Sequence, residues 1–305
     1  MTSKALLLVS VAASVVAACG NYSNEDLEFM AAVPSSSQLA VVLPATTNQN
    51  QAELAADTHN GIGQVNSLLD DVLGLIDTVR SYEPTTRKTN ERIWGPFPDS
   101  NNPGWQWQLD VTRSDATTFG YVLEVAKSAT PDDWVQFLSG SFDAAGGAKQ
   151  GNGMVTVFFS NLANAGFPID PQTAKLTSLM INYQNYQTPG SPVSATLVIQ
   201  QLPDTNGVTS LTFTYEILAD GSGEIGFTLV GNIVPGPNIE TLTINAQWLA
   251  SGAGMATLAV VSGDGAGLTQ VECWDASFDP TYNSKPWMTN ENVGDPTQCP
   301  AAPTF

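Results

Sequence analysis

The sequence contains little histidine, cysteine or basic charge. His59 is the one imidazole in 305 residues, so a Ser-His-Asp or Cys-His catalytic set, or a metal site built on imidazole, would have to use this position. Its place near the start of a predicted helix favours an ordinary surface residue. Ten Lys and Arg face 29 Asp and Glu, which gives a formal net charge of −19. Nucleic acid is therefore not an expected partner, because a polyanion releases no counterions by binding another polyanion.

The apolar run at the N-terminus, from Ala5 to Ala18, is too short for a membrane-spanning helix, which needs about 20 apolar residues. Lys4 precedes the run, and the polar residues "NYSNEDLE" begin at Asn21. A positive start, a short apolar run and small residues at its end are typical of a secretory signal peptide. The sequence therefore predicts a cleaved leader over residues 1–18.

The leader ends on Val16-Ala17-Ala18-Cys19, which resembles the lipobox of bacterial lipoproteins. In that family the cysteine thiolate is the acyl acceptor and becomes the first mature residue. The resemblance implies that acyl chains on Cys19 hold the protein on a membrane, since burial contributes ~0.8 kcal/mol per methylene. Because Gly20 follows the cysteine, in place of Asp, it also implies the outer rather than the inner membrane. The alternative is an ordinary secretory leader with a chance cysteine.

Two cysteines remain, Cys273 and Cys299. In an oxidising compartment an even pair predicts one disulfide, which would hold the C-terminal tail. The loop-entropy model gives such a closure roughly 3.5 kcal/mol. Two metal-binding thiols are the alternative, but no His or third Cys lies nearby to complete a tetrahedral set. No cofactor and no metal are predicted.

The mature chain divides into a tether and one domain. Residues 19–52 mix Asn, Ser, Gln, Ala and Pro, which predicts a lipidated N-terminus followed by a tether. Residues 53–82 predict a long helix, because apolar residues recur at steps of three and four. These residues are Ile62, Val65, Leu69, Val72, Ile76 and Val79. Pro84 and the polar run after it end the helix.

From residue 83 onward the pattern alternates with a period of two, as in "WQWQLDV" from Trp105 and "SLTFTYEI" from Ser210. Turn signals separate about eleven predicted strands by too few residues for a crossover helix, so neighbouring strands pair antiparallel. The fold class predicted is mainly β: a large curved antiparallel meander sheet, open or closed as a barrel. Helix 53–82 is expected against its concave face, and residues 53–305 are expected to form a single domain.

Several candidate sites are weighed against simpler interpretations. Glu272, Asp275 and Asp279 could supply the paired acid and base of glycoside hydrolysis, or could belong to an edge strand leaving the sheet. Asp70-Asp71 is expected on the solvated edge of the helix. The loops "ADGSGE" and "SGDGAG" offer oxygen ligands for calcium without a regular ligand spacing, and a hairpin turn explains both. The strand tryptophans either line a ligand cavity or fill the core: Trp94, Trp105, Trp107, Trp134 and Trp248.

The segments "RIWGPF" after the helix and "ECWDASF" near the end resemble envelope lipoproteins of myxobacterial type. The resemblance implies an address and a shape but no reaction. In general form, a lipid-anchored curved sheet with a helix in its concavity is similar to the lipid-handling lipoproteins of the LolA and LppX type, and fold likeness alone is a weak argument for function. The expected function is a non-enzymatic, outer-membrane-anchored lipoprotein that shelters its own helix alone or a hydrophobic ligand beside it. A structural or adhesive envelope component is the alternative, and a carboxylate-based hydrolase is the least favoured.

Overall fold

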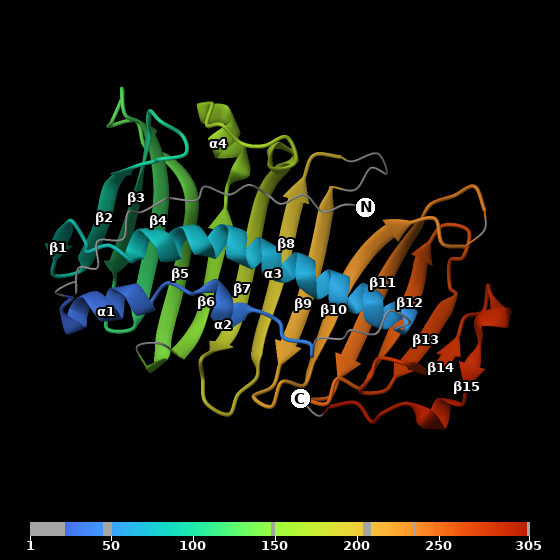
Figure 1. Ribbon diagram of the computed structural model, residues 1–305. Helices are drawn as coiled ribbons and strands as arrows, with labels where there is room; N and C mark the ends of the chain where they lie inside the picture. The colour runs from blue at the N-terminus through green and yellow to red at the C-terminus, as the bar shows by residue number, and fades with distance from the viewer. Residues whose placement is uncertain (1–21, 45–50, 148–149, 204–208, 235, 304–305) are drawn as a thin grey trace. The chain divides into compact units, whose positions relative to one another are not determined.

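The computed structural model describes residues 22–44, 51–147, 150–203, 209–234 and 236–303. It is mainly β, with one antiparallel meander sheet in which the fifteen strands follow one another in chain order (Figure 1). The strands are β1 (Thr86–Lys88), β2 (Glu91–Pro98), β3 (Trp105–Arg113), β4 (Thr118–Lys127), β5 (Val135–Gly147), β6 (Gln150–Val157), β7 (Leu176–Tyr186), β8 (Val193–Gln201), β9 (Ser210–Ile217), β10 (Gly223–Gly231), β11 (Glu240–Trp248), β12 (Gly254–Ser262), β13 (Thr269–Trp274), β14 (Pro280–Ser284) and β15 (Val293–Gly294).

One long helix, α3, and several short helical segments are described beside the sheet. The α-helices are α1 (Asn24–Ala31), α2 (Ser36–Leu39), α3 (Glu53–Arg80) and α4 (Phe159–Ala165), and the 3₁₀ turns are η1 (Thr173–Lys175), η2 (Thr289–Glu291) and η3 (Pro296–Gln298). Among these described helices, none combines the length and the apolar content that crossing a membrane requires.

The prediction of an antiparallel meander is confirmed, and two of its details are corrected. The sheet has fifteen strands where about eleven were predicted, and its order runs from β1 to β15 without closing on itself. The terminal strands have three and two residues, too few for alternation to be recognised. The long helix ends at Arg80, two residues earlier than predicted. Tyr82 N–H donates to the carbonyl of Val79, so the last turn tightens before Pro84.

The described chain forms two compact units. Within the described ranges, unit 1 takes residues 22–39, 67–188 and 199–202, and unit 2 takes residues 40–66, 189–198 and 203–303. The boundary passes through α3, between Asn66 and Ser67, so no change of composition or linker in the sequence marks it.

In unit 1, Val72 and Leu75 of α3 are grouped with Trp107 of β3 and Phe137 of β5 around a small cavity. The strand pattern predicted from "WQWQLDV" is confirmed, because alternate residues of β3 from Trp105 to Val111 are buried. α4 interrupts the succession of hairpins between β6 and β7, and its Phe159 contacts Phe137 of β5 at 6.1 Å between ring centroids. Phe167, just after α4, contacts Trp107 at 5.3 Å. The aromatic side chains of this unit therefore fill its core.

The segment expected to be a tether contains folded structure. Residues 22–44 include α1 and α2, and several of their apolar side chains are buried. Phe29 is fully buried and packs edge-on to Phe119 at 5.6 Å, with the guanidinium of Arg92 above its ring at 4.7 Å. Helix α1 of this segment is therefore docked on unit 1, where a tether was predicted, and Figure 1 shows it beside β1 to β3.

In unit 2, the first turn of α3 contacts β13, since the backbone N–H of Leu54 donates to Glu272. The backbone of α3 comes close to the sheet at Gly61, where an added Cβ would lie 2.9 Å from the ring of Phe227 in β10. Strand β11 also buries alternate residues, among them Leu242, Ile244 and Trp248. A buried sheet face and an apolar helix stripe therefore share one core in this unit.

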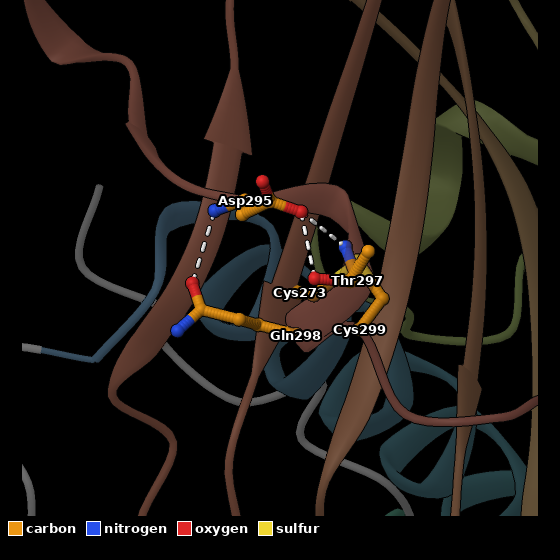
Figure 2. Close-up of a disulfide and its surroundings, with 5 residues drawn as sticks. All are labelled: Cys273, Asp295, Thr297, Gln298 and Cys299. Atoms are coloured by element: carbon orange, nitrogen blue, oxygen red, sulfur yellow. Dashed lines mark hydrogen bonds between the residues drawn. A yellow bond between two sulfur atoms is a disulfide. The ribbon is translucent and has the colours of Figure 1, made fainter.

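The predicted disulfide is present between Cys273 and Cys299, with 5.2 Å between the Cα atoms (Figure 2). Cys273 is fully buried in β13, and Cys299 follows η3. Asp295 caps this short turn, since its Oδ1 accepts from the backbone N–H of Thr297 at 2.8 Å, as drawn in Figure 2. The C-terminal segment is therefore fixed to the sheet by a covalent bond and a local cap.

Candidate functional site

The predicted lipidation residue, Cys19, and the rest of the lipobox lie outside the described residues. The described chain begins at Tyr22, whose hydroxyl donates to the carbonyl of Ser81 at 2.8 Å. Tyr22 therefore lies beside the C-terminal end of α3. A short stretch of chain separates this contact from Cys19.

A buried ion-pair cluster fixes α1 on unit 1. Asp26 is fully buried and accepts from Nε of Arg92 at 2.6 Å and from Nε of Arg87 at 3.1 Å. Ser23 caps the helix, and its backbone N–H donates to Asp26 at 3.0 Å. Burial acts to raise the pKa of Asp26, but these hydrogen bonds outweigh it and lower the pKa to about 2. Asp26 is therefore charged at every physiological pH.

The three carboxylates that suggested glycoside hydrolysis have different surroundings. Glu272 is buried and accepts the backbone N–H of Leu54 in the first turn of α3. Burial raises the pKa of Glu272, although hydrogen bonds from Leu54 and Glu53 oppose the shift. Asp275 accepts the backbone N–H groups of Ser277 at 2.8 Å and Asp279 at 3.1 Å. Glu272 and Asp275 thus take part in a helix cap and a turn.

Lys285 extends this polar cluster at the start of α3. Its side chain is 8% exposed, and Nζ lies 2.8 Å from Glu53 and 3.0 Å from Glu291. Gln270 donates to Asn283 at 3.2 Å beside it. The buried Lys285 cation, between two carboxylates, therefore holds the N-terminal end of α3 to β13 and β14.

His59 is not an ordinary surface residue of the helix. Its ring is half-buried and packs against Phe278 at 4.8 Å between centroids. Nδ1 lies 3.0 Å from the carbonyl oxygen of Ala55, and Nε2 lies 3.2 Å from that of Pro44. Both ring nitrogens therefore face carbonyl oxygens, and the ring links residue 44 to α3 and to the turn before β14.

The adjacent carboxylates of α3 differ in burial. Asp70 is exposed, as predicted for the solvated edge of the helix. Asp71 is half-buried, and its Oδ2 is buried without a hydrogen-bond partner. Burial, helped by Asp70 and Asp170, raises the pKa of Asp71 to about 6. The prediction of two solvated carboxylates is therefore wrong for Asp71, because its carboxylate is partly buried and lies near Asp170.

A small apolar cavity lies in unit 1, beside α4. Its volume is about 40 Å³, and it is lined on one side by Val72 and Leu75 of α3 and on the other by aromatic side chains. The aromatic lining residues are Trp107, Phe137, Phe159 and Phe167. Asp170 also lines it. A cavity of this size is small beside the roughly 300–1,000 Å³ of typical ligand pockets.

The strand tryptophans mainly belong to the core. Trp94, Trp107 and Trp248 are at most 1% exposed, and Trp105 is 8% exposed. Buried indole N–H groups find acceptors, as in Trp94 to the carbonyl of Tyr82 at 2.8 Å. The core interpretation is therefore confirmed for these four residues, with Trp107 also lining the small cavity. Trp134 is half-buried.

The two glycine-rich loops considered for calcium differ. In "ADGSGE", Asp220 accepts from the backbone N–H and the hydroxyl of Ser222, at 2.9 and 2.6 Å, which is a closed local turn. In "SGDGAG", Asp264 instead reaches another loop and accepts from the backbone N–H of Asn238 at 2.7 Å. Within the described ranges no group of three or more His, Cys, Asp or Glu is arranged to hold a metal ion.

Comparison of the chain with protein-family models, with curated proteins and with solved structures gives no match.

Proposed function

We propose that this chain is a lipid-anchored, non-enzymatic protein of the bacterial cell envelope, held by acyl chains on Cys19 in the outer membrane. Its long helix α3 is proposed to cover the apolar sheet face within each unit. The leader, the lipobox and the disulfide between Cys273 and Cys299 support an exported protein.

The observation that carries the proposal is the burial of α3. Its apolar residues in both units are nearly inaccessible, from Val65 at 1% to Leu69 and Ile76 at 0%. An apolar stripe that is already covered by strands in each unit is a core element and leaves little face for another hydrophobic partner. This supports a structural protein in which the chain's own helix α3 covers the apolar face of the sheet.

A sheltered hydrophobic ligand remains a second candidate, favoured by the cavity beside α4. Its lining is mainly apolar and aromatic, which suits an alkyl group. Its volume of about 40 Å³ would accept part of such a group and would have to enlarge for more. The small volume favours instead the structural or adhesive function that needs no ligand.

The anchor is tested by replacing Cys19 with Ser and fractionating cells into membrane and soluble parts. We expect the Cys19→Ser chain to leave the membrane fraction, because the acyl acceptor is lost. An Ala18→Gly variant, which keeps a small residue before the cysteine, is the control and should stay on the membrane. Membrane retention of the Cys19→Ser chain would refute the anchor.

The ligand is tested by native mass spectrometry of the protein extracted from its own membrane. Co-purifying lipid that is lost in a Leu162→Phe variant, which fills the cavity, would favour the sheltering function. A mass that corresponds to the acylated chain alone in both proteins would favour the structural function.

A further inference from the structure

The N-terminal segment is held on unit 1 from its first described residue. The hydroxyl of Tyr22 donates to the carbonyl of Ser81, which directly follows α3, at 2.8 Å. Arg80, the last residue of α3, donates from Nη1 to the carbonyl of Met30 at 2.9 Å. The stretch from Tyr22 to Met30 is therefore fixed at both ends to the C-terminal end of the long helix.

Helix α1, within this stretch, is also bound to the β1–β2 turn and to β3. The carboxylate of Glu25 accepts from Arg92 of β2 at 2.6 Å and from Arg113 of β3 at 2.9 Å. Arg113 also donates to the carbonyl of Thr89, between β1 and β2, at 3.1 Å. We call the exposed residues of α1, Ser81 and the exposed turn residues Thr89 and Asn90 the α1 face.

The chain between the α1 face and Cys19 is short. Three residue steps separate Cys19 from Tyr22, and an extended chain of this length spans at most about 11 Å. The headgroup region of a bilayer is about 5–8 Å thick on each side. If acyl chains on Cys19 enter the hydrocarbon, Tyr22 therefore stays within a few Å of the headgroups. Unit 1 must then approach the lipid with the surface around Tyr22.

The charge of this region suits such an approach. Five of the ten Lys and Arg of the chain lie on or beside the α1 face: Arg80, Arg87, Lys88, Arg92 and Arg113. Six carboxylates pair with them: Glu25, Asp26, Glu28, Asp77, Glu83 and Glu91. Five positive and six negative charges leave −1 here, whereas the whole chain carries −19. Because like charges repel within a Debye length of about 8–10 Å, a nearly neutral face meets little repulsion from anionic headgroups.

The exposed side of α1 adds an apolar contact. The helix buries Asp26 and Phe29 against unit 1 and leaves the side chain of Leu27 48% exposed. Apolar side chains on the exposed side of an interfacial helix enter the boundary between headgroups and acyl chains. Leu27 is therefore suited to this boundary.

We propose that the α1 face rests on the headgroup surface of a lipid bilayer and that the short connection to Cys19 holds it there. This inference rests on the proposed acylation of Cys19 and adds to it a defined orientation of unit 1. The β3–β4 turn begins after Arg113, beside the α1 face, and β4 (Thr118–Lys127) leads away from it. Asp132, beyond the other end of β4, should lie about 30 Å farther from the lipid.

The experiment uses the full acylated chain in vesicles of phosphatidylethanolamine and phosphatidylglycerol that carry a quencher on some headgroups. A fluorescent label is attached to one introduced cysteine at a time, in the variants Leu27→Cys, Asn90→Cys and Asp132→Cys. All three positions are exposed, so the fold should be kept, and the disulfide between Cys273 and Cys299 does not react with the label. We expect strong quenching at positions 27 and 90 and little at position 132.

A linker variant tests whether the short connection holds the face. Gly and Ser residues inserted after Gly20, about twenty in number, form a flexible chain with a root-mean-square span of about 25 Å. The acylated cysteine is kept, so this variant should still sediment with the vesicles. Quenching at positions 27 and 90 should fall to the level at position 132. Quenching that the insertion leaves unchanged would overturn the role of the short connection.

Sedimentation with the vesicles measures the anchor separately from the α1 face. A chain that sediments, but is quenched no more at positions 27 and 90 than at position 132, overturns the α1 face and leaves the anchor intact. An acylated chain that stays in the supernatant overturns the proposed anchor, and the α1 face with it.

Discussion

The carboxylate of Glu272 in β13 accepts the backbone N–H of Leu54 at the start of α3, across 218 residues of sequence. The first N–H groups of a helix have no partner within the helix, and the positive end of the helix dipole favours a negative charge there. Glu272 therefore supplies both an acceptor and a charge to the N-terminus of the long helix. It joins the sheet of unit 2 to the helix segment that covers it.

Removing this acceptor should weaken unit 2. We expect Glu272→Leu to lower the free energy of unfolding by about 1–3 kcal/mol, because a buried N–H group loses its partner. Glu272→Gln should cost clearly less, since the amide oxygen can still accept. Urea unfolding of the two variants measures the difference, and equal losses would mean that α3 does not depend on this cap.

Two glycines of α3 provide a matched test of how the helix packs in unit 2. Gly63 has open space around its Cα, so Gly63→Ala should raise the free energy of unfolding by about 0.5–1 kcal/mol through helix propensity. Gly61 faces the ring of Phe227, so Gly61→Ala should lose that gain or destabilise the protein. Thermal unfolding of both variants gives the comparison. A gain of equal size at both positions would show that the helix does not lie on β10.

Asp26 should determine whether α1 stays docked on unit 1. Asp26→Asn removes one of the two carboxylates that pair with the guanidinium of Arg92, which is 3% exposed, and leaves it only Glu25; breaking such a buried pair costs up to about 3–5 kcal/mol. We expect faster proteolysis within residues 22–44 and a lower melting temperature. Glu28→Gln is the control and should have little effect, because Glu28 is about half exposed in its pair with Arg113.

The pH dependence of the Asp26 contact follows from its lowered pKa. The stability that a carboxylate with a lowered folded-state pKa contributes is present above its ordinary pKa and is lost as the pH falls through the folded-state value. For Asp26 the loss should run from about pH 4 to about pH 2, the folded-state value. Proteolysis by an acid-active protease across this window measures it, and an N-terminal segment that stays protected at pH 2 would contradict the prediction.

Asp71 should have the opposite pH dependence. Its folded-state pKa is raised to about 6, so the stability linked to its proton is full below the ordinary value of about 4 and falls as the pH rises through 6. Asp71→Asn removes the buried charge and should stabilise the protein by about 1 kcal/mol at pH 8, after allowance for solvent around a half-buried group, and by much less at pH 4.

The neighbouring Asp70 supplies the control for that experiment. Asp70→Asn alters an exposed carboxylate on the same turn of α3, so its effect on the melting temperature should be small at both pH values. Unfolding curves of wild type and both variants at pH 4 and pH 8 complete the set. A gain for Asp71→Asn that does not depend on pH would assign the effect to packing and not to charge.

Much of the fold could be predicted because it depends on local patterns. The alternation in "WQWQLDV" is a property of a strand with one buried face, and it placed Trp105, Trp107 and Leu109 in the core correctly. The long helix was predictable from its three-and-four spacing, and the short loops required antiparallel neighbours. The shortest strands, β1 and β15, carry too few residues for such a pattern and were missed.

The candidate sites were harder to predict, because partners distant in sequence define them. The ion pairs of Asp26 could not be predicted, because Arg87 and Arg92 are distant in sequence and meet it only in the folded chain. The capping pair Ser23 and Asp26 was a local signal for α1 that could have been used. The contact between Tyr22 and Ser81 has no local signal, since the two residues lie 59 positions apart in the sequence.

The sequence by itself determined the helix, the alternating strands, their antiparallel order and the pair of cysteines, because each depends on neighbours in the chain or on composition. The tertiary structure decided the rest: that the sheet stays open between β1 and β15, that Glu272 caps a helix 218 residues earlier in the sequence, and that Tyr22 is held beside Ser81. The physical reason is that burial, and with it the free energy and the pKa of each charged group, depends on what distant segments bring to a position.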